Sequence, residues 1–565
     1  MSGRALAVLE RVLPLAVGAG LLLLLGSTIA VRAGHPFDLE WTEGGTLAHA
    51  WRLQRHLPLY VVPGPDFVPF DIPPGYPAIL SALGKIFGLS PLLGRIVSIV
   101  SIGAAAAAAA AVVRRAGAPL RVALCAAVIF LGAYPHVGAS YDLVRPDSLG
   151  LALLGWAVAL GLDARRGAEV ASGLLLCAAT LVQHTLAGFA LPMALGIGLM
   201  QGWRAAGRFL GVALIPTGAL GGWWQWRSDG AFLAYLVEVP ASQPRDWGRA
   251  WLAVPRELGT PLPLAVGAIG LWAVLSSIQR QRGIGPGICA ILGVWSGMIS
   301  AFLGTYRPPP PDSGLYNAPS AVAFWALGTI PVATGLWLLG AGLQRRRGAA
   351  PSGRALYGLG IGCVALIGAA ALRARGGGLL GAYLPLPWCL AVGLGCVCGR
   401  WLAQAPTPWV RALVAGGLTT QLSWSVILFD RAAVVPTSAD LDAGRRVLSS
   451  LLEVEGPVLS PYAAWLPVYL GRPPSLHHAG VWSIEAPSGP FVHELASIEG
   501  ALRGQRWARV VGSDRRFLEA FYEAYEPARQ VVDPRSDLLR PKTGWDVQPW
   551  RLWRPKISPP RAPAG

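Results

Sequence analysis

Three carboxylates lie within six positions of one another, directly after the first long apolar segment: Asp38, Glu40 and Glu43. The whole chain has only 30 acidic residues against 47 Lys and Arg. Carboxylates at the edge of a bilayer can abstract a proton, bind a metal ion or hold a polar group delivered by a lipid. Glu43 precedes two glycines, where other backbone can approach closely. Glu43 is therefore the first choice for a general base and Asp38 the second, while an ordinary solvated loop is the competing interpretation.

A second polar segment closes one apolar run and opens the next, and it contains Asp142, Arg145 and Asp147. Pro146 and Asp147 are typical of a helix start, so Asp147 can be only a first-turn acid. Arg145 lies close to the hydrocarbon, on the side opposite most basic turns. It has two equal interpretations: contact with a phosphate or carboxylate of a ligand, or a local pair with Asp142 or Asp147.

Two further loops carry candidate groups. His184 follows Gln183 in a polar break between two apolar runs, where a satisfied hairpin histidine is favoured over a ligand contact. Arg307 and Asn317 lie in a loop with four consecutive prolines, which also fits a rigid connector. The pair His477-His478 is a weak zinc candidate, because its spacing matches no standard ligand set.

The elements that must position these groups are membrane helices. The chain is 53% hydrophobic and 14% charged, with a mean hydropathy of +0.48, whereas a soluble domain carries about 25% charged residues. Apolar windows long enough to cross roughly 30 Å of hydrocarbon recur from Val12 to Leu428. We expect a mainly α, polytopic bundle of about 13 transmembrane helices. The expected spans are 12–31, 92–113, 121–139, 148–162, 170–182, 185–201, 208–226, 261–277, 286–305, 319–342, 355–372, 378–399 and 408–428.

Two domains are expected. Residues 1–430 form the multi-spanning domain, with a large first outer loop over 32–91. Residues 431–565 have mixed charge and no long apolar run, and they predict a small α/β domain. Its expected elements are a helix over 439–452, strands at 457–459 and 509–512, and a helix over 514–525 capped by Ser513 or Asp514.

The distribution of arginine predicts the orientation. The net charge of +17 is concentrated in short turns, as the positive-inside rule expects of cytoplasmic loops. Anionic lipids, and not nucleic acid, are the expected partners of these turns. The N-terminus is then cytoplasmic, whereas the first loop and the C-terminal domain are extracytoplasmic. Arg373 and Arg375 depart from this pattern, and either snorkel at a helix end or meet a lipid phosphate.

Several short motifs resemble those of the GT-C glycosyltransferases, in particular the family 39-like branch related to protein mannosyltransferases and aminoarabinose transferases. They are Glu43-Gly44, Leu59-Tyr60, Pro69-Phe70, Pro73-Pro74-Gly75-Tyr76, Gly88 with Arg95, the segment Arg145, Asp147, Leu149 and Gly150, and Asn317 with Pro319. Two departures stand out: Thr42 where an aspartate is frequent, and Gln183 where a lysine is frequent.

The resemblance implies transfer of a hexose or pentose from a polyprenyl-phosphate donor, with inversion, at the outer face of a bacterial inner membrane. The acceptor would be a glycan, a glycolipid or a protein. Asp38 or Glu43 would be the base, and these two would also be the ligands if a divalent metal takes part. Arg95, Arg145 or Arg307 would hold the phosphate. The remaining expected substrate contacts are Glu40, Tyr60, Asp71, Tyr76, Asp142, Asp147, His184 and Asn317.

Two other classes compete with this interpretation. A transporter or lipid flippase needs polar groups deep within its helices and often has inverted repeats. In this chain the ionisable residues concentrate at the outer ends of the spans and no repeat is visible. A non-catalytic membrane scaffold would tolerate the loss of every outer carboxylate.

Overall fold

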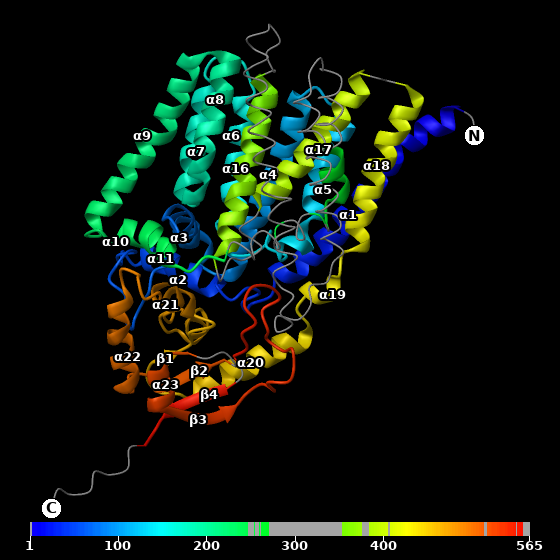
Figure 1. Ribbon diagram of the computed structural model, residues 1–565. Helices are drawn as coiled ribbons and strands as arrows, with labels where there is room; N and C mark the ends of the chain where they lie inside the picture. The colour runs from blue at the N-terminus through cyan, green and yellow to red at the C-terminus, as the bar shows by residue number, and fades with distance from the viewer. Residues whose placement is uncertain are drawn as a thin grey trace, which may run out of the picture.

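The computed structural model describes residues 3–246, 254, 259, 261–269, 353–375, 384–404, 407–513, 517–549 and 551–557. Long helices form a bundle, and an α/β region formed by residues 438–557 lies at one end of it (Figure 1). We call this part the C-terminal region. The expected spans 286–305 and 319–342 and most of 261–277 lie outside the described residues. The predicted fold class, a mainly helical membrane protein with a small C-terminal sheet, is confirmed, whereas the predicted number of helices is not tested.

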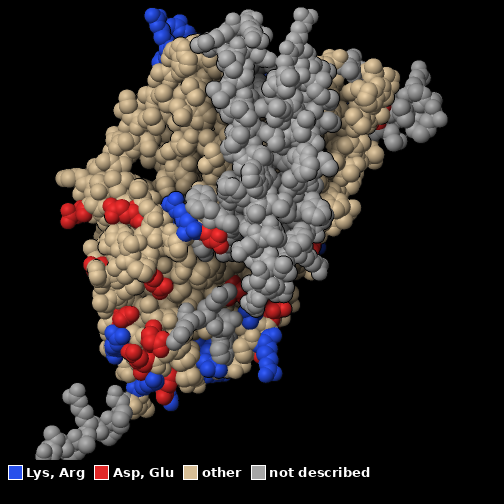
Figure 2. Space-filling model, in the orientation of Figure 1, with Lys and Arg blue, Asp and Glu red and all other residues tan. Residues whose placement is uncertain are grey.

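The bundle is composed of helices whose apolar side chains pack on one another or face outward. Among the described residues, four helical segments are long and apolar enough to cross a membrane: Glu10–Ala33, Pro91–Arg115, Leu356–Ala374 and Pro385–Gln404. The bundle helices are α1 (Gly3–Ala33), α4 (Pro91–Arg115), α5 (Leu120–Gly132), α6 (Asp147–Gly161), α7 (Ala168–Val182), α8 (Ala190–Gln201), α9 (Trp203–Arg227), α16 (Gly353–Ala374), α17 (Pro385–Gln404) and α18 (Pro408–Ile427). On the face seen in Figure 2, charged side chains are sparse over the bundle and gather on the C-terminal region. The chain is a multi-pass membrane protein.

Some predicted spans have different bounds in the structure. α5 ends at Gly132, and a 3-10 turn (Tyr134–Val137) follows it, so the expected span 121–139 is too long. Pro135 lacks an amide hydrogen for a continuing helix, and Gly138 has a positive φ of 67°. The expected span 185–201 divides into a 3-10 helix (His184–Phe189) followed by α8.

The basic turns meet at one end of the bundle. Arg115, the last residue of α4, lies 3.9 Å from Asp163, which follows α6. Gln201 at the end of α8 donates a hydrogen bond to the carbonyl of Asp163 at 3.0 Å, and Arg354 of α16 donates to the carbonyl of Arg115 at 3.4 Å. The acidic first loop lies at the opposite end, beside the C-terminal region (Figure 1). The two ends therefore differ in charge as the sequence predicts, and which end faces the cytoplasm stays a prediction.

The first loop folds into two short helices that lie across the end of the bundle. α2 (Glu43–Gln54) and α3 (Gly75–Phe87) lie between the bundle and the C-terminal region (Figure 1). α3 exposes Ile86 and Phe87, with Lys85 in the same last turn, which is suited to a membrane interface. Residues 231–242 form a further short helical segment (α10 to α11, Ala231–Ser242) that the sequence did not predict.

The C-terminal region contains a four-stranded sheet in the order β1-β2-β4-β3. β1 (Val458–Leu459) is parallel to β2 (Arg509–Gly512), whereas β4 (Arg551–Pro555) is antiparallel to both β2 and β3 (Tyr525–Gln530). The long helix α20 (Ser438–Leu452) begins with a capping box between Thr437 and Asp440. The predicted helix over 514–525 is shorter in the structure: α23 spans Glu519–Ala524, and its predicted cap Asp514 lies outside the described residues.

Two neutral histidines hold the first loop in place: His477 binds it to the C-terminal region, and His49 binds two of its own segments together. Ala479 donates its amide hydrogen to His477 Nδ1 at 2.9 Å, so His477 Nε2 carries the proton and bonds the Trp41 carbonyl at 2.6 Å. In α2, His49 Nε2 accepts from the Phe70 amide at 2.8 Å, which leaves Nδ1 to donate to the Gly45 carbonyl at 2.7 Å. Burial lowers the pKa of both imidazoles to about 4.

These histidines predict an acid-sensitive fold. Their folded pKa values of about 4 lie below the ordinary value of 6.5, so the unfolded chain binds more protons between pH 6.5 and 4 and stability falls as the pH falls through that window. We expect a loss on the order of 1–3 kcal/mol per group. Thermal unfolding in nanodiscs across this range measures it. His477→Phe should flatten the slope, whereas the exposed His493→Ala should leave it unchanged; identical slopes for both variants would contradict the assignment.

Candidate functional site

The acidic loop is organised around a buried ion pair between Glu43 and Arg95. Arg95 Nη2 donates to Glu43 Oε2 at 2.7 Å and Nε donates to Oε1 at 3.0 Å, and both side chains are 0% exposed. The amides of Leu39 and Val144 also donate to this carboxylate, at 2.7 and 2.9 Å. Burial by itself raises the pKa of Glu43, but Arg95 and the amide donors hold it below its usual value. Glu43 is thus an ionised carboxylate with its hydrogen-bonding capacity filled.

Arg95 uses its other N–H groups to fix the chain that leaves α1. Its Nη1 donates to the carbonyls of Arg32, at 3.1 Å, and of His35, and its Nη2 donates to the carbonyl of Phe37 at 2.8 Å. Because its guanidinium is buried and engaged in these contacts, Arg95 has no free edge for a phosphate, for which the resemblance offered Arg95, Arg145 or Arg307. The pair positions the loop rather than presenting a base and a cation to a ligand.

A second buried pair lies beside the first. Arg32, at the end of α1, donates to both carboxylate oxygens of Asp142, at 2.7 and 3.1 Å, and both residues are 0% exposed. The Tyr134 hydroxyl donates to the same carboxylate at 3.1 Å, and Arg32 also donates to the Val434 carbonyl at 2.6 Å. Asp142 is therefore paired with Arg32 at the end of α1 and not with Arg145. Of the two local partners that the sequence offered for Arg145, only Asp147 remains.

Arg145 pairs with Asp147 at 2.8 Å and lies 3.8 Å from Glu40, and its side chain is 15% exposed. Gln183 donates to the other oxygen of Asp147 at 3.2 Å. Glu40 accepts a hydrogen bond from the Thr42 amide at 2.9 Å through Oε2, while its buried Oε1 has no partner among the described residues. Burial, opposed by the charge of Arg145, raises the pKa of Glu40 to about 7.

A more open pair lies beside this group. Arg375 donates to Asp71 at 3.0 Å, with both side chains partly exposed. Arg375 is thus engaged by an acid of the first loop. His184 is close enough for both charges to act on its pKa, which burial lowers, and its buried Nδ1 has no partner within the described part of the chain. Arg145 and Arg375 are the partly exposed cations that face these acids.

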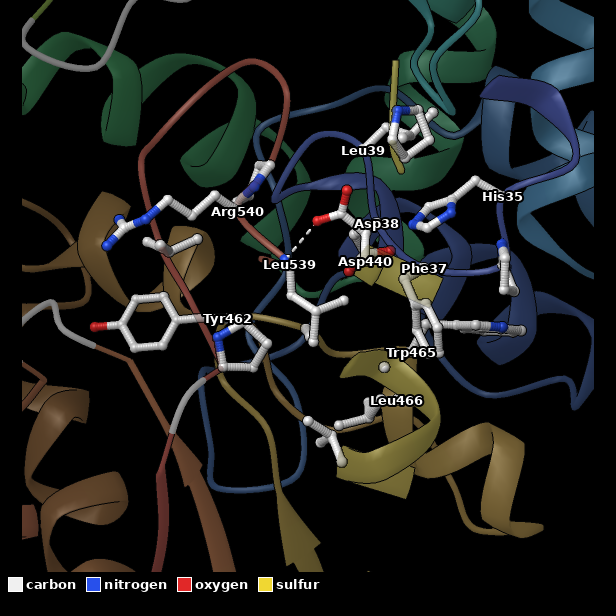
Figure 3. Close-up of a pocket in the computed structure, with 18 of the residues that line it drawn as sticks. His35, Phe37, Asp38, Leu39, Asp440, Tyr462, Trp465, Leu466, Leu539 and Arg540 are labelled. Atoms are coloured by element: carbon white, nitrogen blue, oxygen red, sulfur yellow. Dashed lines mark hydrogen bonds between the residues drawn. The ribbon is translucent and has the colours of Figure 1, made fainter. Parts of the chain in front are cut away.

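Asp38 lines a pocket between the first loop and the C-terminal region (Figure 3). The empty space in the pocket and in front of it, open solvent included, is about 640 Å³. Asp38 is partly exposed and makes no hydrogen bond or ion pair with any described residue. Burial and the nearby charge of Glu43 raise its pKa well above the ordinary value. Asp38 thus combines three properties of a general base: access, free lone pairs and a raised proton affinity.

Other predicted contacts are buried in the protein's own packing. The Tyr60 hydroxyl donates to the Ile72 carbonyl at 2.8 Å, and the Tyr76 hydroxyl lies 3.3 Å from both the Gly94 carbonyl and the Ser98 hydroxyl. Both tyrosines are less than 4% exposed. Arg307 and Asn317 lie outside the described residues.

A divalent metal held by Asp38 and Glu43 does not fit this geometry, because Arg95 and two backbone amides occupy the Glu43 carboxylate. Within the described part of the chain, no group of three or more His, Cys, Asp or Glu side chains is arranged to hold a metal ion. His477 is excluded as a zinc ligand in this arrangement, because both of its ring nitrogens are engaged.

Three positions of the site were missed from the sequence. Arg32 ends the first apolar run on the side opposite the basic turns, which is the signal that singled out Arg145. Tyr469 and Lys542 line the Asp38 pocket from the C-terminal region. They lie more than 400 residues from Asp38, and no local pattern connects them to it.

No family model matches the chain, and no curated protein matches it. Two solved structures align with nearly all of it. The crystal structure of ArnT from Cupriavidus metallidurans in the apo state is 17% identical, covers 95% of this chain and 98% of its own, and has a TM-score of 0.48. The structure of the same protein bound to undecaprenyl phosphate is 15% identical, covers 99% of both chains, and has a TM-score of 0.45. The chain is similar to these structures in overall arrangement, and the function proposed below rests on its own site.

The buried pair predicts a large stability effect. Glu43→Gln keeps the volume of the side chain but leaves the charge of Arg95 buried without its partner, which costs about 3–5 kcal/mol. We expect a clear fall in the thermal unfolding midpoint of the purified protein. Glu523→Gln, at an exposed pair with Arg503, is the matched control and should change stability by about 1 kcal/mol or less. Equal effects of the two variants would rule out the anchoring role of Glu43.

Proposed function

We propose that this protein is a membrane glycosyltransferase that moves a sugar from a polyprenyl-phosphate donor to an acceptor at the outer membrane face. The observation that carries the proposal is Asp38, an accessible carboxylate of raised pKa without a protein partner among the described residues, held beside a cluster of paired acids and arginines. The cluster lies at the end of the membrane helices, where the phosphate of a membrane-anchored lipid would lie.

The chemistry is a single displacement. The acceptor oxygen attacks the anomeric carbon, the bond from that carbon to the phosphate oxygen breaks, and polyprenyl phosphate leaves with the bonding electrons. The acceptor proton passes to Asp38, which has free lone pairs for it. One displacement at the anomeric carbon inverts its configuration. Of the two carboxylates that the sequence offered as the base, we therefore propose Asp38, with Glu43 as the residue that positions it.

The departing phosphate gains negative charge and needs cations near its oxygens. Arg145 and Arg375 are partly exposed and lie beside acids at this end of the bundle. We assign the phosphate to these two arginines, each of which would exchange part of its contact with Asp147 or Asp71 for the ligand. His184, with its unpartnered Nδ1, is placed to add a hydrogen bond.

Substitution of Asp38 tests the proposal. Asp38→Asn is nearly isosteric and, since Asp38 has no partner among the described residues, should leave the unfolding midpoint unchanged. We expect transfer to fall by about 100-fold or more, the usual contribution of a general base. The measurement is release of labelled sugar from a panel of polyprenyl-phosphate sugars by protein in liposomes, with crude membrane extract as the acceptor source.

Glu523→Gln serves as the activity control, because that residue lies on an exposed surface pair. Full activity of Asp38→Asn would exclude Asp38 as the base. Absence of release by the unchanged protein from every donor would contradict the enzyme class and favour a transporter or a scaffold.

The orientation is tested separately. We propose that the N-terminus is cytoplasmic and that the C-terminal region is extracytoplasmic. A reporter enzyme active only outside the cytoplasm should be active when fused after residue 557 and inactive when inserted in the basic turn after Arg166. The reverse result would place the acidic loop in the cytoplasm and exclude transfer at the outer face.

A further inference from the structure

One side of the Asp38 pocket is lined by residues of the C-terminal region. Residues 538–549, which we call the strap, pass over the first loop. The Lys542 amide donates to the Leu39 carbonyl at 2.8 Å, and Thr543 pairs with Glu40 in a parallel backbone bridge. Trp545 stacks on Trp41 with ring centroids 4.7 Å apart and planes within 3°. The strap thus joins the first loop through both backbone and side-chain contacts.

The path of the strap is specified by its own residues. Gly544 has a positive φ of 88°, and a side chain there would come within 2.7 Å of Glu40 Oε1. Leu539 also has a positive φ, of 57°, and its amide donates to Asp440 at 2.8 Å. These backbone conformations and this hydrogen bond define the path of the strap over the pocket.

The lining combines aromatic rings with a few polar groups. Tyr469 is 39% exposed, donates to the Pro36 carbonyl, and packs edge-to-face on Phe37 at 6.1 Å. Tyr469 and Asp38 both line the pocket. Lys542 lies 3.4 Å from Asp440, and both residues line the pocket.

We infer that this pocket is the acceptor site and that the acceptor is a sugar, bound with its ring on Tyr469 and its nucleophilic hydroxyl at Asp38. The inference rests on the proposed function. Aromatic faces suit the apolar C–H surface of a sugar ring, and carboxylate and ammonium groups suit its hydroxyls. The lining carries two acids and two cations, Asp38, Asp440, Arg540 and Lys542, and this balance favours a neutral sugar over a strongly charged acceptor.

The position of the pocket indicates that the acceptor approaches Asp38 from the C-terminal region, whereas the donor approaches from the membrane helices. The proposed phosphate cations, Arg145 and Arg375, lie with the membrane helices, whereas the strap and Tyr469 belong to the C-terminal region. Asp38 lies in the first loop between the two. Donor and acceptor therefore approach the first loop from different parts of the chain.

Variants of Tyr469 test the inference with the full-length protein in nanodiscs, free of sugar-based detergents. Tyr469→Ala removes the ring, and Tyr469→Phe keeps it while removing the hydroxyl. Binding of a panel of methyl hexosides and methyl pentosides is measured by saturation-transfer NMR, and the KM values of acceptor and donor are measured with the sugar-release assay. Arg506→Ala, at an exposed pair with Asp66, is the control.

We expect the unchanged protein to bind at least one glycoside, and Tyr469→Ala to weaken that binding and raise the acceptor KM by about five- to tenfold. Tyr469→Phe should stay within about twofold and the donor KM should not change. No binding of any glycoside, or an acceptor KM unaffected by Tyr469→Ala, would overturn the acceptor site while donor turnover still supports the enzyme class. If no donor turns over, the class fails, and loss of glycoside binding in Tyr469→Ala still decides whether the pocket is a sugar site.

Discussion

The arrangement of the site depends on one buried ion pair, between Glu43 and Arg95. A fully buried charge is tolerated only where an opposite charge and hydrogen bonds compensate for the lost water. Arg95 supplies the charge from α4, while backbone amides of the first loop and of the turn before α6 supply the hydrogen bonds. Because the carboxylate has to satisfy all of these donors at once, the three segments can meet in only one arrangement.

This anchoring separates the roles of the acidic residues. Glu43 and Asp142 are buried and paired with arginines, and they fix the loop to the helices. Asp38 emerges from the same fixed loop with its lone pairs free and with its proton affinity raised by burial and by the negative charge of Glu43. In the proposed mechanism, Glu43 positions Asp38, because the fixed loop holds Asp38 near the negative charge of Glu43.

The C-terminal region completes the site from the other side. The sheet and α20 support the strap, and the strap reaches the first loop through a backbone bridge and the Trp41–Trp545 stack. The neutral His477 adds a hydrogen bond across the same boundary, to the Trp41 carbonyl, and this bond depends on one tautomer of the ring. The site is therefore made from two parts of the chain, and loosening their contact would open the pocket without unfolding the membrane helices.

The sequence by itself determined the membrane class, most helix positions, the early elements of the C-terminal sheet and the acidic segment that matters. These features follow from composition and from periodicity within about 20 residues, which is the range of a single helix or strand. It ranked Glu43 above Asp38 because two glycines follow Glu43, but the two acids differ in environment only because Arg95, 52 residues away, pairs with Glu43. Likewise, Arg32 meets Asp142 across 110 residues, and Lys542 and Tyr469 meet the first loop across more than 400. Only the tertiary structure decided which carboxylate is free, because pairing and desolvation depend on neighbours that the local sequence does not contain.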